Sequence, residues 1–386
     1  MKCEEKSRRK EKMVVLNVHL DNFYAFKNFH INFTYPKKIV GSYLEGEHLP
    51  ERSNFRYKKI NIIFGANASG KTTFGRVLMM IFNFISKKNY NHITEAICDR
   101  SKNAEFVVDF ASENNYFYRV KCIITPIQQA EYNSGNIKIQ VIKQYIRSRD
   151  SYEICAKRIQ EKEFCPAENY IEELEKMGDL AWLFEYPNEG GQILNLPDGN
   201  NNFRFVLENI LKALDPHIRE VKISKEVKNT YVVYLRDKAV VLQNGNTLDT
   251  NLLSSGTKAG VEVAHILFSI IQGNNIFYYC DEKFSYIHSD VEKAVLALMI
   301  DYIGSKEQLF FTTHNTDILD MDLPKHTFTF LRKNILDTEC PITCVDASSL
   351  LKRNTDSLRG AVENDLFSAA PALEYIYDIR KMDKGQ

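Results

Sequence analysis

The sequence predicts an α/β fold in which a mostly parallel sheet is flanked by helices. In the last third of the chain, residues 252–273 read as a loop and a helix, 275–282 as a strand, 289–304 as a helix and 308–314 as a strand. This alternation is typical of parallel sheets whose faces are covered by helices. A second observation is the apolar run 57–65, which ends at a glycine-rich turn and passes into a helical pattern over 73–86. The length of 386 residues allows one large domain or a domain with an inserted lobe.

Composition excludes several function classes. Fifty basic residues balance fifty acidic ones, so nucleic acid is not indicated as a partner by charge, and binding it would require a local basic patch. The longest apolar run, residues 77–85, is far shorter than the roughly 20 residues that span a bilayer. The eight cysteines form no CxxC pair, none has zinc-like spacing, and no secretory leader opens the chain. We therefore expect a cytoplasmic protein without a membrane partner.

The remaining elements are predicted in chain order. Strands are expected at 14–20 and 29–33, and a hairpin at 104–112 and 116–125. The more polar stretch from about 130 to 200 holds a charged helix candidate over 168–184. A helix over 203–215 and strands at 219–226, 230–236 and 238–243 follow. Gln128 and Gln129 lie after the hairpin, in a candidate functional loop. A pair of glutamines in a loop is more often an ordinary part of the protein surface.

The glycine-rich turn carries the most specific motif. It reads GxxxxGK[ST] without departure, between a strand and an amphipathic helix. In this motif backbone N–H groups point at phosphates, the lysine reaches the β/γ-phosphates and the hydroxyl binds Mg²⁺. The nucleotide-binding residues expected here are Gly65, Ala66, Asn67, Ala68, Ser69, Gly70, Lys71 and Thr72, followed by Thr73.

A second element is the strand 275–282, which ends in two carboxylates. We expect Asp281 to hold Mg²⁺ together with Thr72, and Glu282 to polarise the attacking water. Two further stretches are weak signals of a functional site when each is taken alone. Ser254, Ser255 and Gly256 begin a helix, where Ser-Gly is usually a cap, and His314 ends the next strand, where a lone histidine is usually structural.

The order of these elements resembles ABC-type ATPases, in the soluble branch that includes SMC, RecF and OLD-family proteins. The stretches "TTHNTDIL" and "DEKFSYIHSD" look most like AAA-family ATPases of prokaryotic anti-phage defence operons, such as PARIS, Septu and OLD-like systems. The resemblance covers residues 14–125 and 203–335. Lys283, where transporters usually have proline, argues against a transporter subunit. The aromatic stretch 21–29 resembles a motif near the nucleotide in the same branch, although its rings equally suit a core.

The resemblance implies an ABC-type P-loop ATPase that uses ATP and Mg²⁺, with Lys71, Glu282 and His314 as catalytic residues. It further implies that Ser255 and Gly256 bind the γ-phosphate held by the opposite subunit, and that residues 284–290 form a loop at the dimer interface. The expected partners are a second copy, as a homodimer or dimer-based higher oligomer, and a separate effector such as a nuclease or toxin. The alternatives are a RecF- or SMC-like DNA-repair clamp and an ATP-locked scaffold with little turnover.

The expected organisation follows from these motifs. Residues 1–12 form a disordered tail, 13–125 the first half of the ATPase domain and 126–202 an inserted lobe. Residues 203–345 form the second half, with the 254–256 stretch, the Asp281-Glu282 strand and His314, and 346–386 a helical extension. The expected fold also includes an antiparallel β subdomain beside the mostly parallel sheet. Only 72 residues follow His314, less than a nuclease domain requires, so a nuclease or toxin would be another chain.

Overall fold

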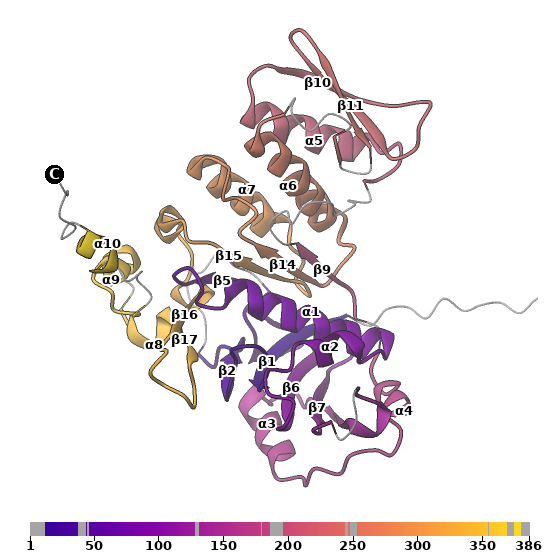
Figure 1. The fold of residues 1–386 in the computed structure, drawn as a ribbon, viewed down its shortest axis with the longest axis vertical. Helices are drawn as coiled ribbons and strands as arrows, with labels where there is room; N and C mark the ends of the chain where they lie inside the picture. The colour runs from indigo at the N-terminus through magenta and orange to yellow at the C-terminus, as the bar shows by residue number, and fades with distance from the viewer. Residues whose placement is uncertain are drawn as a thin grey trace, which may run out of the picture.

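The computed structural model describes residues 12–37, 44, 46–127, 131–178, 180–185, 196–243, 246–247, 253–353, 355–368 and 374–379. The expected tail therefore lies, up to residue 11, outside the described residues, as do Gln128 and Gln129. Figure 1 shows a central sheet, an antiparallel sheet below it and a lobe above it. No helix in these ranges is long and apolar enough to cross a membrane.

The central sheet has the strand order β17-β16-β5-β15-β14-β9. Its strands are β5 (Ile60–Phe64), β9 (Trp182–Glu185), β14 (Phe277–Asp281), β15 (Gln308–Thr312), β16 (Phe328–Lys333) and β17 (Ile342–Asp346). All pairs are parallel except that of β16 with the edge strand β17. The predicted mostly parallel sheet is confirmed, and it brings the carboxyl ends of β5, β14 and β15 to one edge.

The two faces of this sheet pack into different cores because side chains alternate along a strand. Phe277, Tyr279 and Phe310 face α1 (Lys71–Lys87) and the antiparallel sheet. Tyr278 and Phe311 face the opposite core, which α6 (Ser255–Gln272) and α7 (Ser289–Tyr302) complete. The central strands are consequently buried on both faces and read as continuous apolar runs.

The antiparallel sheet has the order β2-β1-β6-β7-β8. Its strands are β1 (Met13–Asp21), β2 (Phe29–Asn32), β6 (Ala104–Ser112), β7 (Tyr116–Ile124) and β8 (Ile137–Tyr145). The short strands β3 (His48–Leu49) and β4 (Arg52–Arg56) pair with each other in a separate two-stranded sheet. The predicted hairpin corresponds to β6 and β7. The helices and turns along this half are α2 (Asn91–Glu95), η1 (Ser134–Asn136), α3 (Tyr152–Gln160) and α4 (Tyr170–Leu174).

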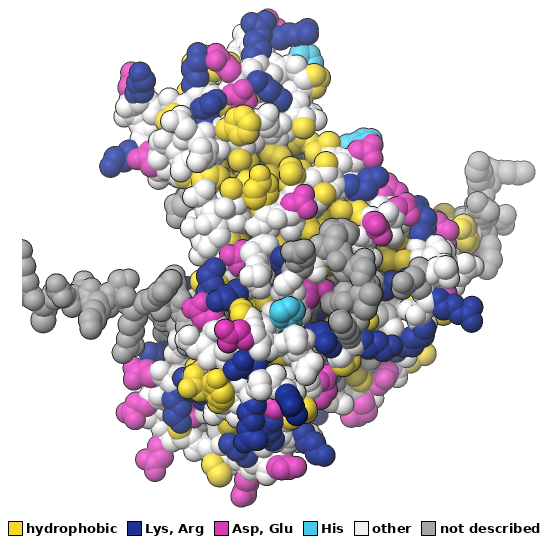
Figure 2. Space-filling view, turned by 180° about the vertical axis from the view of Figure 1, so that it is seen from behind, with side chains coloured by type: hydrophobic (Ala, Val, Ile, Leu, Met, Phe, Trp, Pro, Cys, Tyr) yellow, Lys and Arg dark blue, Asp and Glu magenta, His cyan; other side chains and the backbone are white. Residues whose placement is uncertain are grey.

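The upper lobe consists of α5 (Asn201–Leu214) and the sheet β10-β11-β12-β13, with β10 (Ile218–Ile223), β11 (Thr230–Leu235), β12 (Ala239–Gln243) and β13 (Asn246–Thr247). An apolar groove of about 380 Å³ runs between α5, α6 and α7. Figure 2 shows hydrophobic side chains gathered between this lobe and the rest of the molecule, and charges of both signs interspersed over most of the visible face. That mixture agrees with the zero net charge.

The stretch 126–202 differs from the sequence expectation in its secondary structure. The prediction of one charged helix over 168–184 is wrong beyond Leu174. Helix α4 covers only Tyr170–Leu174, and Trp182–Glu185 form strand β9. The apolar WLF run pairs in parallel with β14, and burial at the sheet edge overrides the helical pattern of charges before it. Within the same stretch, β8 extends the antiparallel sheet beside β7.

The C-terminal part continues the fold through short elements. These are η2 (Thr316–Asp320), η3 (Lys325–Thr327), α8 (Ala347–Leu350), α9 (Leu358–Glu363) and α10 (Glu374–Asp378). Figure 1 shows α9 and α10 at the side of the molecule where β16 and β17 form the sheet edge.

Candidate nucleotide-binding site

The glycine-rich turn joins β5 to α1 in a conformation that its sequence permits. Gly70 caps α1 with φ 104°, and Ala68 also has a positive φ of 63°. A Cβ atom on Gly65 would lie 2.4 Å from Ser69 Oγ and 2.7 Å from the carbonyl oxygen of Leu331. Glycine is therefore required at position 65, because any side chain there would fill the turn.

The turn presents donors that suit an anion. The first N–H groups of α1 have no partner within the helix, and no side chain caps its N-terminus. Among the described residues, the buried hydroxyl of Ser69 has no hydrogen-bond partner. Unsatisfied buried donors at a helix N-terminus fit a phosphate group, which supplies acceptor oxygens and the negative charge that the helix dipole favours.

Lys71 lies beneath this turn with 4% of its surface exposed. Its Nζ donates to the carbonyl oxygen of Gly65 at 2.8 Å and lies 3.1 Å from Glu282 Oε1. The ammonium group therefore sits between the P-loop backbone and the carboxylate expected to act on water.

Thr72 and Asp281 are brought together as expected for a magnesium site. Thr72 Oγ1 donates to Asp281 Oδ2 at 2.6 Å, and Thr312 Oγ1 donates to Asp281 Oδ1 at 2.5 Å. Burial raises the pKa of Asp281, and the two hydroxyl hydrogen bonds oppose that rise. A hydroxyl and a carboxylate beside phosphate oxygens are the ligand types that Mg²⁺ uses in such sites. In the described part of the chain, no group of three or more His, Cys, Asp or Glu side chains is placed so that it could hold a metal ion by itself.

Glu282 and His314 lie on adjacent strand ends. Glu282 has φ 44°, and its N–H donates to the carbonyl and hydroxyl oxygens of Thr312. His314 Nδ1 lies 3.9 Å from Glu282 Oε1, and the imidazole is 56% exposed. Both residues line a cavity of about 270 Å³, together with Phe284, Ser285, Ile287, Ser289, Glu292, Thr313 and Asn315. The wall of this cavity therefore contains a carboxylate and an imidazole.

The structure places Ser254, Ser255 and Gly256 at the start of α6. Ser254 Oγ caps the helix by accepting from the N–H of Thr257, and both serines are exposed. A Cβ on Gly256 would lie 2.9 Å from the carbonyl oxygen of Tyr286, so these residues adjoin the 284–290 loop. No hydrogen bond or ion pair among the described residues connects them to the P-loop.

Several residues at the site were not singled out from the sequence. Thr312 fixes Asp281, and Tyr279 donates its hydroxyl hydrogen to the carbonyl oxygen of Lys71 at 2.8 Å. Lys283 was noted in the sequence only as a departure from transporters; its side chain is buried and donates to Glu262 Oε2 at 2.6 Å, with Glu185 Oε2 at 3.8 Å. Only the double threonine before His314 gave a local signal, because the other contacts join residues distant in sequence.

The aromatic stretch 21–29 contributes to the core and also reaches the site. Phe23, Phe26 and Phe29 are fully buried. A Cβ on Gly70 would lie 3.4 Å from Cζ of Phe26, so this ring supports the underside of the P-loop.

No protein-family model matches the chain, and no curated protein matches it in sequence. Solved structures match in fold. The SMC head bound to the C-winged helix domain of ScpA aligns with a TM-score of 0.50 and 12% identity, over 87% of this chain and 99% of that chain. An Smc head with an extended coiled coil, bound to the C-terminal domain of ScpA derived from Pyrococcus furiosus, aligns with a TM-score of 0.51 and 11% identity. This alignment covers 88% of this chain and 98% of that chain. The expected ABC-type P-loop fold is thereby confirmed.

Proposed function

We propose that the chain is an ATPase that binds ATP with Mg²⁺, closes as a dimer around the nucleotide and hydrolyses it. The observation that carries this proposal is the convergence of Lys71, Thr72, Asp281 and Glu282 at one edge of the central sheet. Each has the side chain that its step requires, and the P-loop offers unsatisfied donors next to them.

Each residue has a defined part in this proposal. The N–H groups of residues 65–73 and the ammonium of Lys71 bind the phosphates. Thr72 and Asp281 would hold Mg²⁺, which would supply positive charge to the phosphate oxygens. Glu282 accepts a proton from the attacking water, and His314 contacts the terminal phosphate from the neighbouring strand end. Lys71 exchanges its contact with Glu282 for phosphate oxygens, which frees the carboxylate for the water.

The exposed start of α6 supports a site shared between two copies. Ser255 and Gly256 present a hydroxyl and backbone N–H groups to solvent beside the 284–290 loop, in which Tyr286 and His288 are also exposed. A two-fold contact would bring this surface of one copy onto the P-loop of the other and form two equivalent sites. ATP would then favour the closed state because it contacts both chains only there.

A finer proposal is that closure holds or frees a separate effector in anti-phage defence. It rests on the resemblance of residues 281–290 and 312–319 to ATPases of such operons. We place this activity in the cytoplasm, where the free cysteines of the described chain would stay reduced. Plaque assays with the neighbouring genes test it: protection should require those genes and be lost with Lys71→Ala, and protection unaffected by that change would contradict it.

The ATPase proposal is tested with Glu282→Gln. The amide is nearly isosteric but cannot accept the proton, so the variant should bind ATP and hydrolyse it very slowly. Analytical ultracentrifugation should show a dimer that persists in ATP and dissociates in ADP.

Lys71→Ala provides the matched control, because it should remain monomeric in ATP. An unchanged sedimentation coefficient of Glu282→Gln in saturating ATP, with binding verified by calorimetry, would exclude closure as a dimer. Wild-type turnover by Glu282→Gln would exclude Glu282 as the base.

A further inference from the structure

The loop that carries His314 is fixed from helix α7 through both neighbours of the histidine. Thr313 Oγ1 donates to Glu292 Oε1 at 3.0 Å, and Asn315 Nδ2 donates to Glu292 Oε2 at 2.6 Å. Glu292 is 3% exposed, so this carboxylate is a buried bidentate acceptor. His314 itself makes no such bond in the described chain beyond its 3.9 Å approach to Glu282. Its position is therefore determined by how its neighbours are held.

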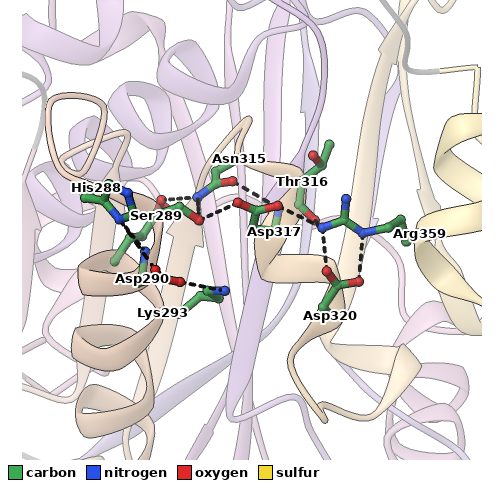
Figure 3. Close-up of polar contacts among 10 residues, drawn as sticks. His288, Ser289, Asp290, Lys293, Asn315, Thr316, Asp317, Asp320 and Arg359 are labelled. Atoms are coloured by element: carbon green, nitrogen blue, oxygen red, sulfur yellow. Dashed lines mark hydrogen bonds and ion pairs between the residues drawn. The ribbon is translucent and has the colours of Figure 1, made fainter.

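A second set of contacts holds the same loop one turn further along (Figure 3). Ser289 Oγ accepts from Asn315 Nδ2 at 3.2 Å and donates to Asp317 Oδ2 at 2.6 Å. The other oxygen of Asp317 accepts from Nη2 of Arg359 at 2.8 Å. Asp317 is thus bonded on one side to α7 and on the other to α9.

Arg359 donates hydrogen bonds to more than one group of η2. Its Nε donates to Asp320 Oδ1 at 2.8 Å, and its Nη2 also approaches Asp320 Oδ2 and the carbonyl oxygen of Thr316. A guanidinium group is suited to this because its donors form a rigid planar fork. The fork spans η2 from its first residue to its last.

Helix α9 is itself held by the core, so Arg359 is presented from a fixed support. Leu358 is buried, and Phe367 is 1% exposed. The ring of Phe367 stacks on Phe330 with centroids 3.9 Å apart, and Phe330 stacks on Phe64 at 5.6 Å. Phe64 is the last residue of β5 before Gly65. The segment 355–368 therefore packs toward the P-loop strand through Phe367 and binds the His314 loop through Arg359.

We propose that Arg359 is a positioning residue for His314, through which the C-terminal segment 355–368 sets the rate of the hydrolysis step. This inference rests on the proposed ATPase function and concerns the regulation of the same site. Ion pairs with this exposure contribute little to global stability. The main effect of the Arg359 contacts is to hold residues 313–317, and with them His314, in a fixed geometry. Small displacements of a catalytic group lower turnover strongly.

The test compares Arg359→Gln with wild type in steady-state ATP hydrolysis. The variant should lose about tenfold in kcat with an unchanged KM for ATP, because the P-loop is untouched. Among the described residues, the side-chain hydrogen bonds and ion pairs of Asp320 go to Arg359, so adding Asp320→Asn to Arg359→Gln should reduce kcat little further. Amide hydrogen exchange in residues 313–320 should rise in Arg359→Gln.

The control is Lys325→Gln, which removes the ion pair of η3 with Asp356 of the same C-terminal segment and the hydrogen bond to the carbonyl oxygen of Arg353 just before it. This variant should keep the kcat of wild type. Wild-type kcat in Arg359→Gln, or an equal loss in Lys325→Gln, would overturn the inference while the ATPase proposal stands. Absence of hydrolysis by the wild type would instead overturn the proposed function, and the inference with it.

Discussion

Gly75 lies in α1 where this helix packs against β14, and its replacement by alanine probes the contact between the P-loop helix and the strand of Asp281. A Cβ at this position would lie 2.4 Å from Cε1 and 2.7 Å from Cζ of Tyr279. Ordinary carbon contacts are about 3.5–4.0 Å, so the ring or the helix must move by more than about 1 Å. Tyr279 is 1% exposed and stacks on Phe184, which leaves its ring little freedom.

The expected magnitude is a balance of three effects. Alanine is favoured over glycine inside a helix by about 0.5–1 kcal/mol. Overpacking a rigid core costs about 1–3 kcal/mol, and loss of the hydrogen bond from Tyr279 to the carbonyl oxygen of Lys71 costs about 1 kcal/mol. Gly75→Ala should therefore lower the free energy of unfolding by about 2 kcal/mol, and it should weaken ATP binding because Lys71 and Thr72 begin the displaced helix.

Urea unfolding at an unchanged m-value measures the stability change, and calorimetry measures the affinity for ATP. The matched variant is Gly75→Ala combined with Tyr279→Leu, which removes the ring that the methyl group meets. Its destabilisation should be smaller than the sum of the two single changes. A Gly75→Ala protein as stable as wild type, with normal ATP affinity, would refute the proposed packing of α1 on β14.

Three further predictions concern charged groups. Lys71→Ala should abolish tight ATP binding in calorimetry because the turn loses its side-chain cation, and normal affinity in a folded variant would contradict the P-loop assignment. Lys283→Met should lower the free energy of unfolding by about 3–5 kcal/mol, because Glu262 and Glu185 would stay buried without their counter-charge; a loss below about 1 kcal/mol in urea unfolding would contradict this. Hydrogen bonds from Ser289 and Arg359 lower the pKa of Asp317, and Arg359 lowers that of Asp320. A carboxylate whose pKa is lower in the folded protein than in the unfolded chain stabilises the protein at pH values above its ordinary pKa of 3.8. That contribution is lost as the pH falls through the folded-state pKa. The small difference in thermal stability between wild type and Arg359→Gln should thus be fully present at neutral pH and vanish in acid, and a difference that grows in acid would be inconsistent with the ion pairs.

Much of the fold could be predicted because its signals are local. The P-loop motif between a strand and a helix, and the alternation in residues 252–314, both predicted the parallel sheet. The helix over 168–184 could not be predicted correctly, because the edge of β14 decides the structure of Trp182–Glu185 and that strand lies about 95 residues away.

The site was predictable where one short motif holds several of its residues. Lys71 and Thr72 belong to the P-loop motif, and Asp281 and Glu282 end a single strand. Glu292 and Arg359 carry no such mark, because their roles arise from hydrogen bonds between elements that only the folded chain brings together. Reading such roles requires the geometry of strand ends and helix faces in addition to the sequence.

The shared site is tested most directly by mixing two inactive chains. Lys71→Ala destroys the P-loop and Ser255→Arg blocks the start of α6, so each variant alone should not hydrolyse ATP. A heterodimer retains one intact site, formed by the P-loop of the Ser255→Arg chain and the α6 start of the Lys71→Ala chain. Random exchange should restore about a quarter of wild-type hydrolysis, because half of the dimers are mixed and each has one of two sites. No recovery, despite subunit exchange demonstrated by fluorescence energy transfer, would contradict the shared site and favour a P-loop site complete within one chain.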